Sequence, residues 1–372
     1  APLFKSEAKP DGTLAFSQLT TRLCHERILQ MPDSPARRAF LQLAQGFLKI
    51  HGLQGNIDAD PYLPRHWPLI LNGEPPVTVV IPTDGVGDLV AQSLRSLEKQ
   101  SLRWFETIVV QSHEEPEPLP DLPSAHRLMR PGADVAALRN AGLEAATGRF
   151  VVFLDAGDTL KPDALLWWVD GMLREDTKLG VTNFDQVGEN DDVHTGLHDL
   201  RPFEGVPKDG PMSLDPVRAI CLHAHPSAKI FDRRFLKECK IRFPSEPLGS
   251  WGLIMAVARR LDRMFYFASI GVSIDKRPEA RRLWRAPQSP AALHSAVQMI
   301  GQMVPEPLNE NDKLRLLIRA IWEKYEHAGM SDDARAQFLS LARQELPAHA
   351  PPREWFDPYL SGAFFSLLFN LT

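Results

Sequence analysis

Two aspartates directly after a short apolar run have the residue type and spacing of a ligand-binding loop. Asp155 and Asp158 follow residues 150–154, FVVFL, which are typical of a buried strand. In open α/β sheets, ligands bind outside the carboxyl ends of the strands. A divalent metal ion or a nucleotide sugar-phosphate is therefore expected at this loop. The alternative for Asp158 is capping of the helix that starts near Pro162, because Asp is favoured at that position.

The segments around this loop alternate between strand and helix patterns. Continuous β-branched runs such as VTVVIP predict strands that are buried on both faces. The expected strands cover residues 77–82, 105–110, 150–154, 179–184 and 264–274, and the expected helices cover residues 88–100, 134–146, 162–173 and 251–261. Residues 227–236 predict a strand-to-helix unit, and residues 185–213 predict a loop. This alternation implies an α/β fold with a mostly parallel sheet flanked by helices.

The pattern changes along the chain and divides it into three regions. Residues 1–75 combine helical spacing with a Pro-rich linker, residues 76–280 carry the α/β pattern, and residues 281–372 are mostly helical. We therefore expect one α/β domain with helical N- and C-terminal extensions. These terminal helical regions are where a protein partner could bind.

Composition and charge argue against several classes of protein. A net charge of −5 provides no general basic field, so nucleic acid is not an expected partner. Cys24, Cys221 and Cys239 are isolated and odd in number, which fits a reducing compartment rather than a disulfide framework. No apolar run approaches the ~20 residues that cross a bilayer. We expect a cytoplasmic protein, and any location at the inner membrane face would be peripheral.

Four segments carry a more specific pattern. They are VVIPTDG (79–85), SLRSLEKQSLRWFETIVV (93–110), LRNAGLEAATGRFVVFLDAGD (138–158) and SAKIFDRRFLKECKIRFPSEPLGSWGLIMAVARR (227–260). Their order and residues resemble the landmarks of inverting family 2 glycosyltransferases of the GT-A fold. The third segment is the most specific, because its helix, turn, strand and acid spacing all agree with the family. The resemblance covers residues 76–275 and implies a GT-A-like, Rossmann-like fold.

The resemblance implies a donor site at the ends of several strands. The residues expected to bind a nucleotide-diphosphate sugar are Pro82, Thr83, Asp84, Gln111, Arg139 and Asp155. Asp155 and Asp158 are also expected to bind a divalent metal, Mn2+ or Mg2+. Two positions depart from the family: Gln111 stands where an acid usually holds the base, and Gly157 replaces the middle acid of Asp-x-Asp. A Gln amide can bond a base edge but offers no negative charge.

The acceptor side departs further from the family. The family places an acidic pair before a helix, and this pair supplies the base that deprotonates the acceptor hydroxyl. That place aligns here with Gly249 and Ser250, ahead of Trp251. Glu246 is the nearest carboxylate and is the expected catalytic base, provided that its loop brings it within ~3 Å of the proton. His225 is the alternative base.

Two functions from different classes fit these observations. The first is transfer of a sugar from a nucleotide-diphosphate sugar to a glycan, a lipid-linked acceptor or another hydroxyl compound, in surface polysaccharide or glycoconjugate synthesis. The second is a catalytically inactive glycosyltransferase-like protein that binds glycans or acts as a scaffold, since three altered polar positions would mark such a loss. A Rossmann-type dehydrogenase is disfavoured, because PTDGVGD has no GxGxxG after the first strand.

Overall fold

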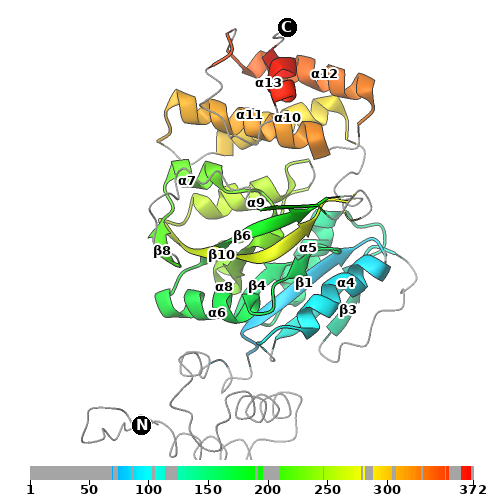
Figure 1. The fold of residues 1–372 in the computed structure, drawn as a ribbon, viewed down its shortest axis with the longest axis vertical. Helices are drawn as coiled ribbons and strands as arrows, with labels where there is room; N and C mark the ends of the chain where they lie inside the picture. Colours follow the sequence, from blue (N-terminus) through cyan, green and yellow to red (C-terminus); the bar gives the residue numbers. More distant parts are fainter. Residues whose placement is uncertain are drawn as a thin grey trace, which may run out of the picture.

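The computed structural model of the 372-residue chain shows a central sheet with helices on both faces and a further layer of C-terminal helices (Figure 1). The residues that the structure describes are 69, 74–85, 87–102, 105–113, 125–188, 192–195, 209–245, 247–277, 280, 288–303, 307–327, 330–347, 349–351 and 362–369. The expected N-terminal helical region therefore lies almost entirely outside the described residues.

A parallel half of the sheet carries the edge where the ligand is expected. Its strands are β1 (Val77–Thr83), β2 (Glu106–Gln111), β3 (Ala125–Met129) and β4 (Phe150–Phe153), and the helices that connect them are α4 (Gly87–Glu98) and α5 (Val135–Ala145). The strand order is β3-β2-β1-β4 and all three neighbouring pairs are parallel. Val80 of β1 lies opposite both Ile108 and Phe153. The carboxyl ends of these strands therefore lie together at one edge.

Side chains of β1 alternate between two hydrophobic cores, one on each face of the sheet. Val77, Val79 and Ile81 pack in the core that contains α4 and α6 (Ala164–Glu175). Val80 packs in the other core, which contains α5 and α9 (Gly249–Ala258). Every residue of β1 is buried. Burial on both faces explains the continuous apolar run that the sequence shows here.

Two glycines in the NAGLEAATG segment let α5 and the following turn lie close to β1. A Cβ on Gly142 would overlap Cγ1 of Val80, and a Cβ on Gly148 would lie 2.6 Å from the backbone nitrogen of Thr78. The helix begins after Asp134, whose Oδ1 accepts a hydrogen bond from the N–H of Ala137 at 2.7 Å. These contacts fix the position at which β4 begins beside β1.

The other half of the sheet is mixed. Its strands are β5 (Thr159–Leu160), β6 (Leu179–Val187), β7 (Val193–Thr195), β8 (Gly210–Ser213), β9 (Lys229–Asp232) and β10 (Arg263–Asp275). β9 is antiparallel to both β4 and β6, whereas β10 is parallel to β6. The expected loop over residues 185–213 is wrong in part, because β6 continues to Val187 and β7 and β8 lie within it. Backbone pairing with β6 and β10 holds these short segments, VHT and GPMS, which lack a strand-like pattern.

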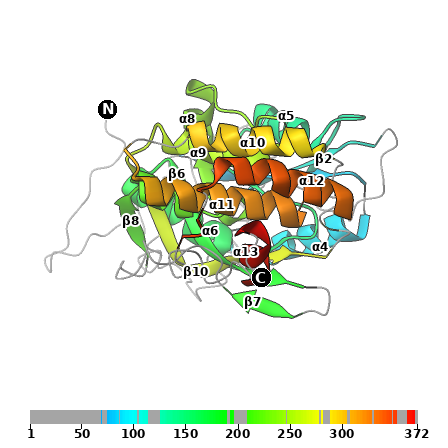
Figure 2. The same ribbon diagram turned by 90° about the horizontal axis from the view of Figure 1, so that it is seen from above.

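The C-terminal helices lie beyond α9, on one face of the sheet (Figures 1 and 2). They are α10 (Pro290–Met303), α11 (Glu310–His327), α12 (Asp332–Ala342) and α13 (Gly362–Phe369), and the shorter helices near them are α7 (Pro216–Cys221) and α8 (Arg233–Glu238). One hydrophobic core runs from the sheet through α9 into these four helices. The predicted boundary near residue 280 thus separates two segments of sequence that share a core.

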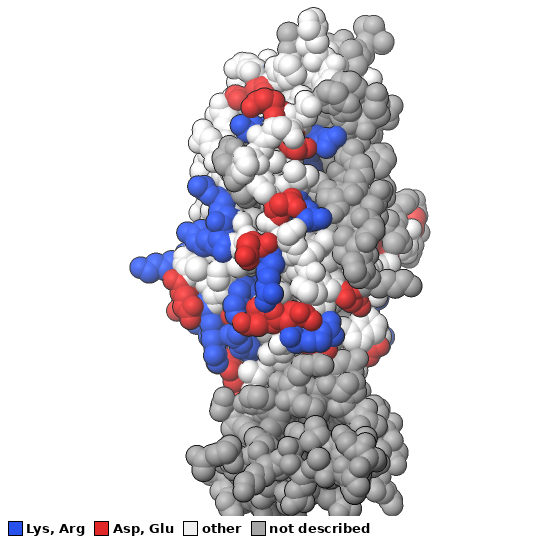
Figure 3. Space-filling view, turned by 90° about the vertical axis from the view of Figure 1, so that its left-hand side faces the viewer, with Lys and Arg blue, Asp and Glu red and all other residues white. Residues whose placement is uncertain are grey.

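On the face drawn in Figure 3, basic and acidic side chains are interspersed rather than sorted into patches of one sign. Within the part of the chain that the structure describes, no helix combines the length and the apolar character needed to cross a membrane.

Candidate functional site

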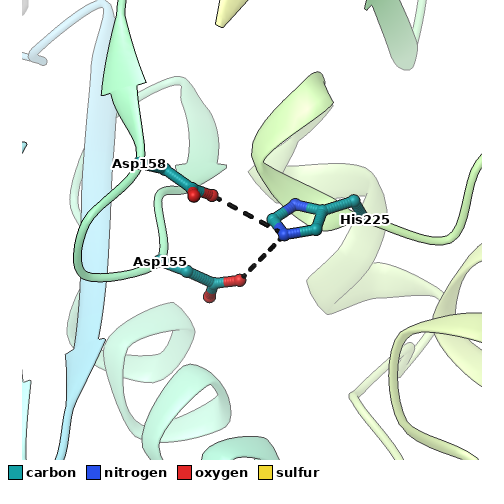
Figure 4. Close-up of side chains that lie close together, drawn as sticks. All are labelled: Asp155, Asp158 and His225. Atoms are coloured by element: carbon teal, nitrogen blue, oxygen red, sulfur yellow. Dashed lines mark ion pairs between the residues drawn. The ribbon is translucent and has the colours of Figure 1, made fainter. Parts of the chain in front are cut away.

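Three buried side chains meet at the carboxyl edge of the sheet. Asp155 and Asp158 follow β4, and His225 precedes a short 3-10 helix, η3 (Pro226–Ala228). Nε2 of His225 lies 3.5 Å from Oδ2 of Asp155 and 3.7 Å from Oδ2 of Asp158 (Figure 4). Nδ1 of His225 accepts a hydrogen bond from the N–H of Ser227 at 3.4 Å, which turns Nε2 toward the carboxylates. One ligand atom from each of the three residues lies within 4.8 Å of the others.

A buried arginine orients Asp155. Arg139 lies in α5 with no exposed side-chain surface, and its Nη2 donates to Oδ1 of Asp155 at 2.7 Å. Its Nη1 donates to Oγ of Ser250 at 3.3 Å. The backbone N–H of Asp155 donates to Oγ of Ser227 at 3.2 Å. Because Arg139 engages Oδ1, the other oxygen of Asp155 faces His225.

Asp158 is held by two further hydrogen bonds. Its Oδ2 accepts from the hydroxyl of Ser227 at 2.7 Å, and its Oδ1 accepts from the N–H of Asp275 at 2.9 Å. The capping alternative for Asp158 is wrong, because the cap position of α6 is occupied by Asp163. Sequence reasoning missed Ser227 and Asp275. The signal for Asp275 was its place at the end of an apolar strand, the same criterion that identified Asp155.

The segment that presents His225 is built around a buried lysine. Lys229 in β9 is 1% exposed, and its ammonium donates to the carbonyl oxygens of His223 and His225, the latter at 2.9 Å. The pKa of Lys229 is lowered to about 7, chiefly by burial and to a smaller extent by the charge of Arg319, while Glu323 opposes the shift. Sequence reasoning missed Lys229 as well. The available signal was a lone lysine inside the buried strand pattern KIFD.

The three clustered side chains suit a divalent cation. Carboxylate oxygens are ligands for Mg2+ and Mn2+, and imidazole nitrogen is a ligand for the softer transition metals. Arg139 bonded to Asp155 and Ser227 bonded to Asp158 are the kind of outer contacts that orient metal ligands. The donor set of Asp155, Asp158 and His225 therefore fits a metal such as Mn2+ that accepts both oxygen and nitrogen.

Packing explains why the loop has a glycine where the family has its middle acid. Gly157 has a φ of 98°, a conformation that residues with a Cβ rarely adopt. A Cβ at this position would lie 3.0 Å from Cβ of Ala280 and 3.2 Å from Oδ2 of Asp275. An acid at residue 157 is therefore disfavoured, and the third group of the cluster is His225 instead.

The other residues expected at the donor lie at the ends of β1 and β2. Pro82 and Thr83 are buried and Asp84 is partly buried, with Oγ1 of Thr83 accepting from the N–H of Gly85 at 3.1 Å. Gln111 ends β2 and is fully buried. Neither amide atom of Gln111 has a hydrogen-bond partner among the described residues. Such a group costs ~1–3 kcal/mol when left unpaired, so the position suits a ligand that offers a donor and an acceptor.

The start of α9 has no carboxylate among its described residues, 247–250. Gly249 and Ser250 begin the helix, and Ser250 is 4% exposed with its Oγ accepting from Arg139. Ser250 is therefore bonded to the same arginine that orients Asp155. Glu246 lies outside the described residues, so its role as the base stays a prediction. The structure places His225 beside the two aspartates, and its role as an alternative base also stays a prediction.

Comparison with known proteins adds sequence and structural relatives. Residues 78–239 match the model of a family described as "Glycosyl transferase family 2". The crystal structure of S. aureus TarS 1-349 in complex with UDP-GlcNAc is 18% identical with a TM-score of 0.55, over 73% of this chain and 82% of that chain. The complex of TarS 1-349 with UDP is 17% identical with a TM-score of 0.53, over 73% and 81%. A further structure of S. aureus TarS is 16% identical with a TM-score of 0.53, over 78% of this chain and 52% of that chain. No curated protein matches the chain.

These findings confirm the expected family and fold. The sequence match begins in β1 and ends just past α8, so it includes the parallel half of the sheet and the cluster of Asp155, Asp158 and His225. The likeness to TarS, at this level of identity, shows the architecture alone. Residues 78–239 therefore form a glycosyltransferase family 2 region, and the chain has the GT-A fold.

Proposed function

We propose that this chain transfers a sugar from a nucleotide-diphosphate sugar to a hydroxyl acceptor, with inversion at the anomeric carbon. The observation that carries the proposal is the cluster of Asp155, Asp158 and His225 at the end of β4, inside a family 2 region. The TarS structures with UDP-GlcNAc and with UDP support a nucleotide-sugar donor. The acceptor we propose is a glycan or a lipid-linked sugar in surface polysaccharide or glycoconjugate synthesis.

The charge of the site favours a metal-dependent donor. Arg139 is ion-paired with Asp155, while Asp158 is held by the neutral donors of Ser227 and Asp275. The buried site therefore keeps excess negative charge, which attracts a cation and repels a diphosphate that arrives without one. Mn2+ or Mg2+ bound by Asp155, Asp158 and His225 would stabilise the charge of the departing diphosphate.

The nucleoside is proposed to bind at the ends of β1 and β2. The buried amide of Gln111 offers one donor and one acceptor direction, and a nucleobase edge can satisfy both. Pro82, Thr83 and Asp84 are proposed to contact the nucleoside from β1. Arg139 is proposed to act through Asp155, because its guanidinium is fully buried behind that carboxylate.

The acceptor is proposed to be activated by Glu246. This carboxylate would take the proton of the acceptor hydroxyl as the oxygen attacks the anomeric carbon and the bond to the diphosphate breaks. Glu246 is the nearest acid in the sequence to Gly249 and Ser250, which stand where the family has its acidic pair. We assign His225 to the metal because its Nε2 already faces Asp155 and Asp158.

A second candidate function is supported by the residues at the start of α9. Ser250 stands there where the family has an acid, and it contacts Arg139 instead. An inactive family member that binds a glycan or serves as a scaffold would tolerate this loss. The two functions differ in turnover: both allow donor binding, whereas only the transferase releases nucleoside diphosphate.

Thermal unfolding with a panel of nucleoside diphosphates, each with and without Mn2+ or Mg2+, tests the donor site. A ligand at a hundred times its dissociation constant is expected to stabilise the chain by ~2.7 kcal/mol. His225→Gln is expected to lose the metal-dependent part of this shift. Asp163→Asn is the matched control, since Asp163 makes no side-chain hydrogen bond at its helix cap. No shift with any nucleotide and metal would contradict the proposal.

Release of nucleoside diphosphate from a panel of nucleotide sugars then separates the two candidates. A transferase is expected to release it in the presence of a suitable acceptor, and slowly to water without one. Donor binding without any release, across a broad range of acceptors, would favour the inactive binding protein.

A further inference from the structure

A buried lysine holds the backbone of the segment that presents His225. Lys229 is 1% exposed, and its ammonium donates to the carbonyl oxygens of His223 and His225. An ammonium loses its hydration on burial, and an apolar side chain of similar length would avoid that cost. The presence of a lysine is therefore explained by what its ammonium holds, the two carbonyl groups on either side of Ala224.

These carbonyl contacts belong to a network that sets the direction of the His225 imidazole. The N–H of His225 donates to Nδ1 of His223 at 3.1 Å, and the N–H of Ser227 donates to Nδ1 of His225 at 3.4 Å. The ring of His223 packs edge-on against Phe184, with 5.0 Å between ring centroids. Lys229 fixes the backbone and Ser227 fixes the ring, so Nε2 points at the two aspartates.

We propose that Lys229 is a positioning residue for His225, because its ammonium holds the backbone that presents the imidazole to Asp155 and Asp158. This inference rests on the proposed metal-dependent function.

Binding of Mn2+ alone to the full chain tests this inference, because pulsed EPR detects nitrogen bound to the metal. The wild-type chain is expected to show nitrogen hyperfine coupling, and His225→Gln should abolish it. Lys229→Met keeps the length of the side chain but removes its donors. We expect this variant to lose most of the nitrogen coupling and to bind Mn2+ about 10–100-fold more weakly, the range found for residues that orient metal ligands.

A matched control and a second variant separate positioning from general damage. Lys178→Met removes a lysine whose side chain is 31% exposed and which pairs with Asp176 and Asp232, and it should leave coupling and affinity unchanged. Lys229→Gln keeps an uncharged N–H donor on a shorter side chain, so it should retain part of the nitrogen coupling and bind Mn2+ with an affinity between those of the wild-type chain and Lys229→Met.

The outcomes are distinguishable. Wild-type coupling and affinity in Lys229→Met would overturn the positioning role and leave the proposed function standing. Absence of Mn2+ binding by the wild-type chain would overturn both. If Lys229→Met fails to fold, Lys229→Gln decides: unchanged Mn2+ affinity overturns the inference, and reduced affinity with retained folding supports it.

Discussion

The two sides of the site depart from the family to different degrees. On the proposed donor side, Arg139, Asp155 and Asp158 match the family pattern while Gln111 and Gly157 do not, and Arg139 is ion-paired with Asp155. On the acceptor side, Gly249 and Ser250 stand in place of two acids. The two sides also differ physically, because Arg139, Asp155 and Asp158 form a buried ion pair and hydrogen bonds. We therefore expect these residues to contribute to stability as well as to the proposed chemistry.

The largest effect on stability is expected from breaking the buried pair. Asp155→Asn leaves the guanidinium of Arg139 buried without an anionic partner, which typically costs ~3–5 kcal/mol. Unfolding in urea measures this loss. Asp163→Asn, at a partly buried helix cap without a side-chain hydrogen bond, should change stability by less than ~0.5 kcal/mol. Equal stabilities for the two variants would show that the ion pair of Arg139 and Asp155 does not stabilise the fold.

The acceptor side predicts a different kind of effect. Glu246→Gln is expected to slow sugar transfer by ~10²–10⁴-fold, the usual contribution of a general base, and to leave donor binding unchanged. Initial rates and nucleotide affinity, measured on the same preparation, test this separation. Glu238→Gln, in α8, is the control. Full transfer activity in Glu246→Gln would show that another residue is the catalytic base, with His225 as the alternative.

Restoring the family's middle acid at residue 157 should destabilise the fold. Gly157→Asp introduces a Cβ at a φ of 98° and within 3.0 Å of Cβ of Ala280. Strained backbone of this kind costs ~1–3 kcal/mol, so we expect a loss of that size without tighter Mn2+ binding. Urea unfolding and Mn2+ titration provide the two readouts. A stable variant that binds Mn2+ more tightly would mean that His225 does not replace the missing acid.

The smallest effect is a dependence of stability on pH. Lys229 has a folded-state pKa of about 7, below the ordinary value of 10.5 that applies when the chain is unfolded. Between these values the unfolded chain binds the extra proton, so the free energy of unfolding should rise with pH. Relative to Lys229→Met, the rise should be about 1 kcal/mol per pH unit, and it should vanish below pH 7, where both states are protonated. Unfolding in urea from pH 7 to pH 9 measures it, and parallel curves for the two proteins would contradict it.

The sequence predicted the parts of the molecule that rest on local patterns. The strands before Asp84, Gln111 and Asp155 have continuous apolar runs, so the edge where ligands are expected could be located before the structure was known. The spacing of the NAGLEAATG segment also reflects a real packing constraint, the close approach of Gly142 to Val80.

What the sequence could not predict depends on contacts between distant segments. His225 meets Asp155 only because β9 inserts antiparallel between β4 and β6. The strands β7 and β8 form through pairing with β6 and β10, although their own short sequences, VHT and GPMS, have no strand-like pattern. No local pattern carries any of these relationships.

Calorimetric titration of the wild-type chain and of His225→Gln with nucleoside diphosphates, each with and without Mn2+, tests the central claim most directly. The claim is that Asp155, Asp158 and His225 hold a cation that binds the donor diphosphate. We predict that at least one nucleoside diphosphate binds the wild-type chain in the presence of Mn2+, and that His225→Gln weakens this binding about tenfold or more. Absence of binding by every nucleoside diphosphate, or binding that neither Mn2+ nor His225→Gln alters, would contradict it.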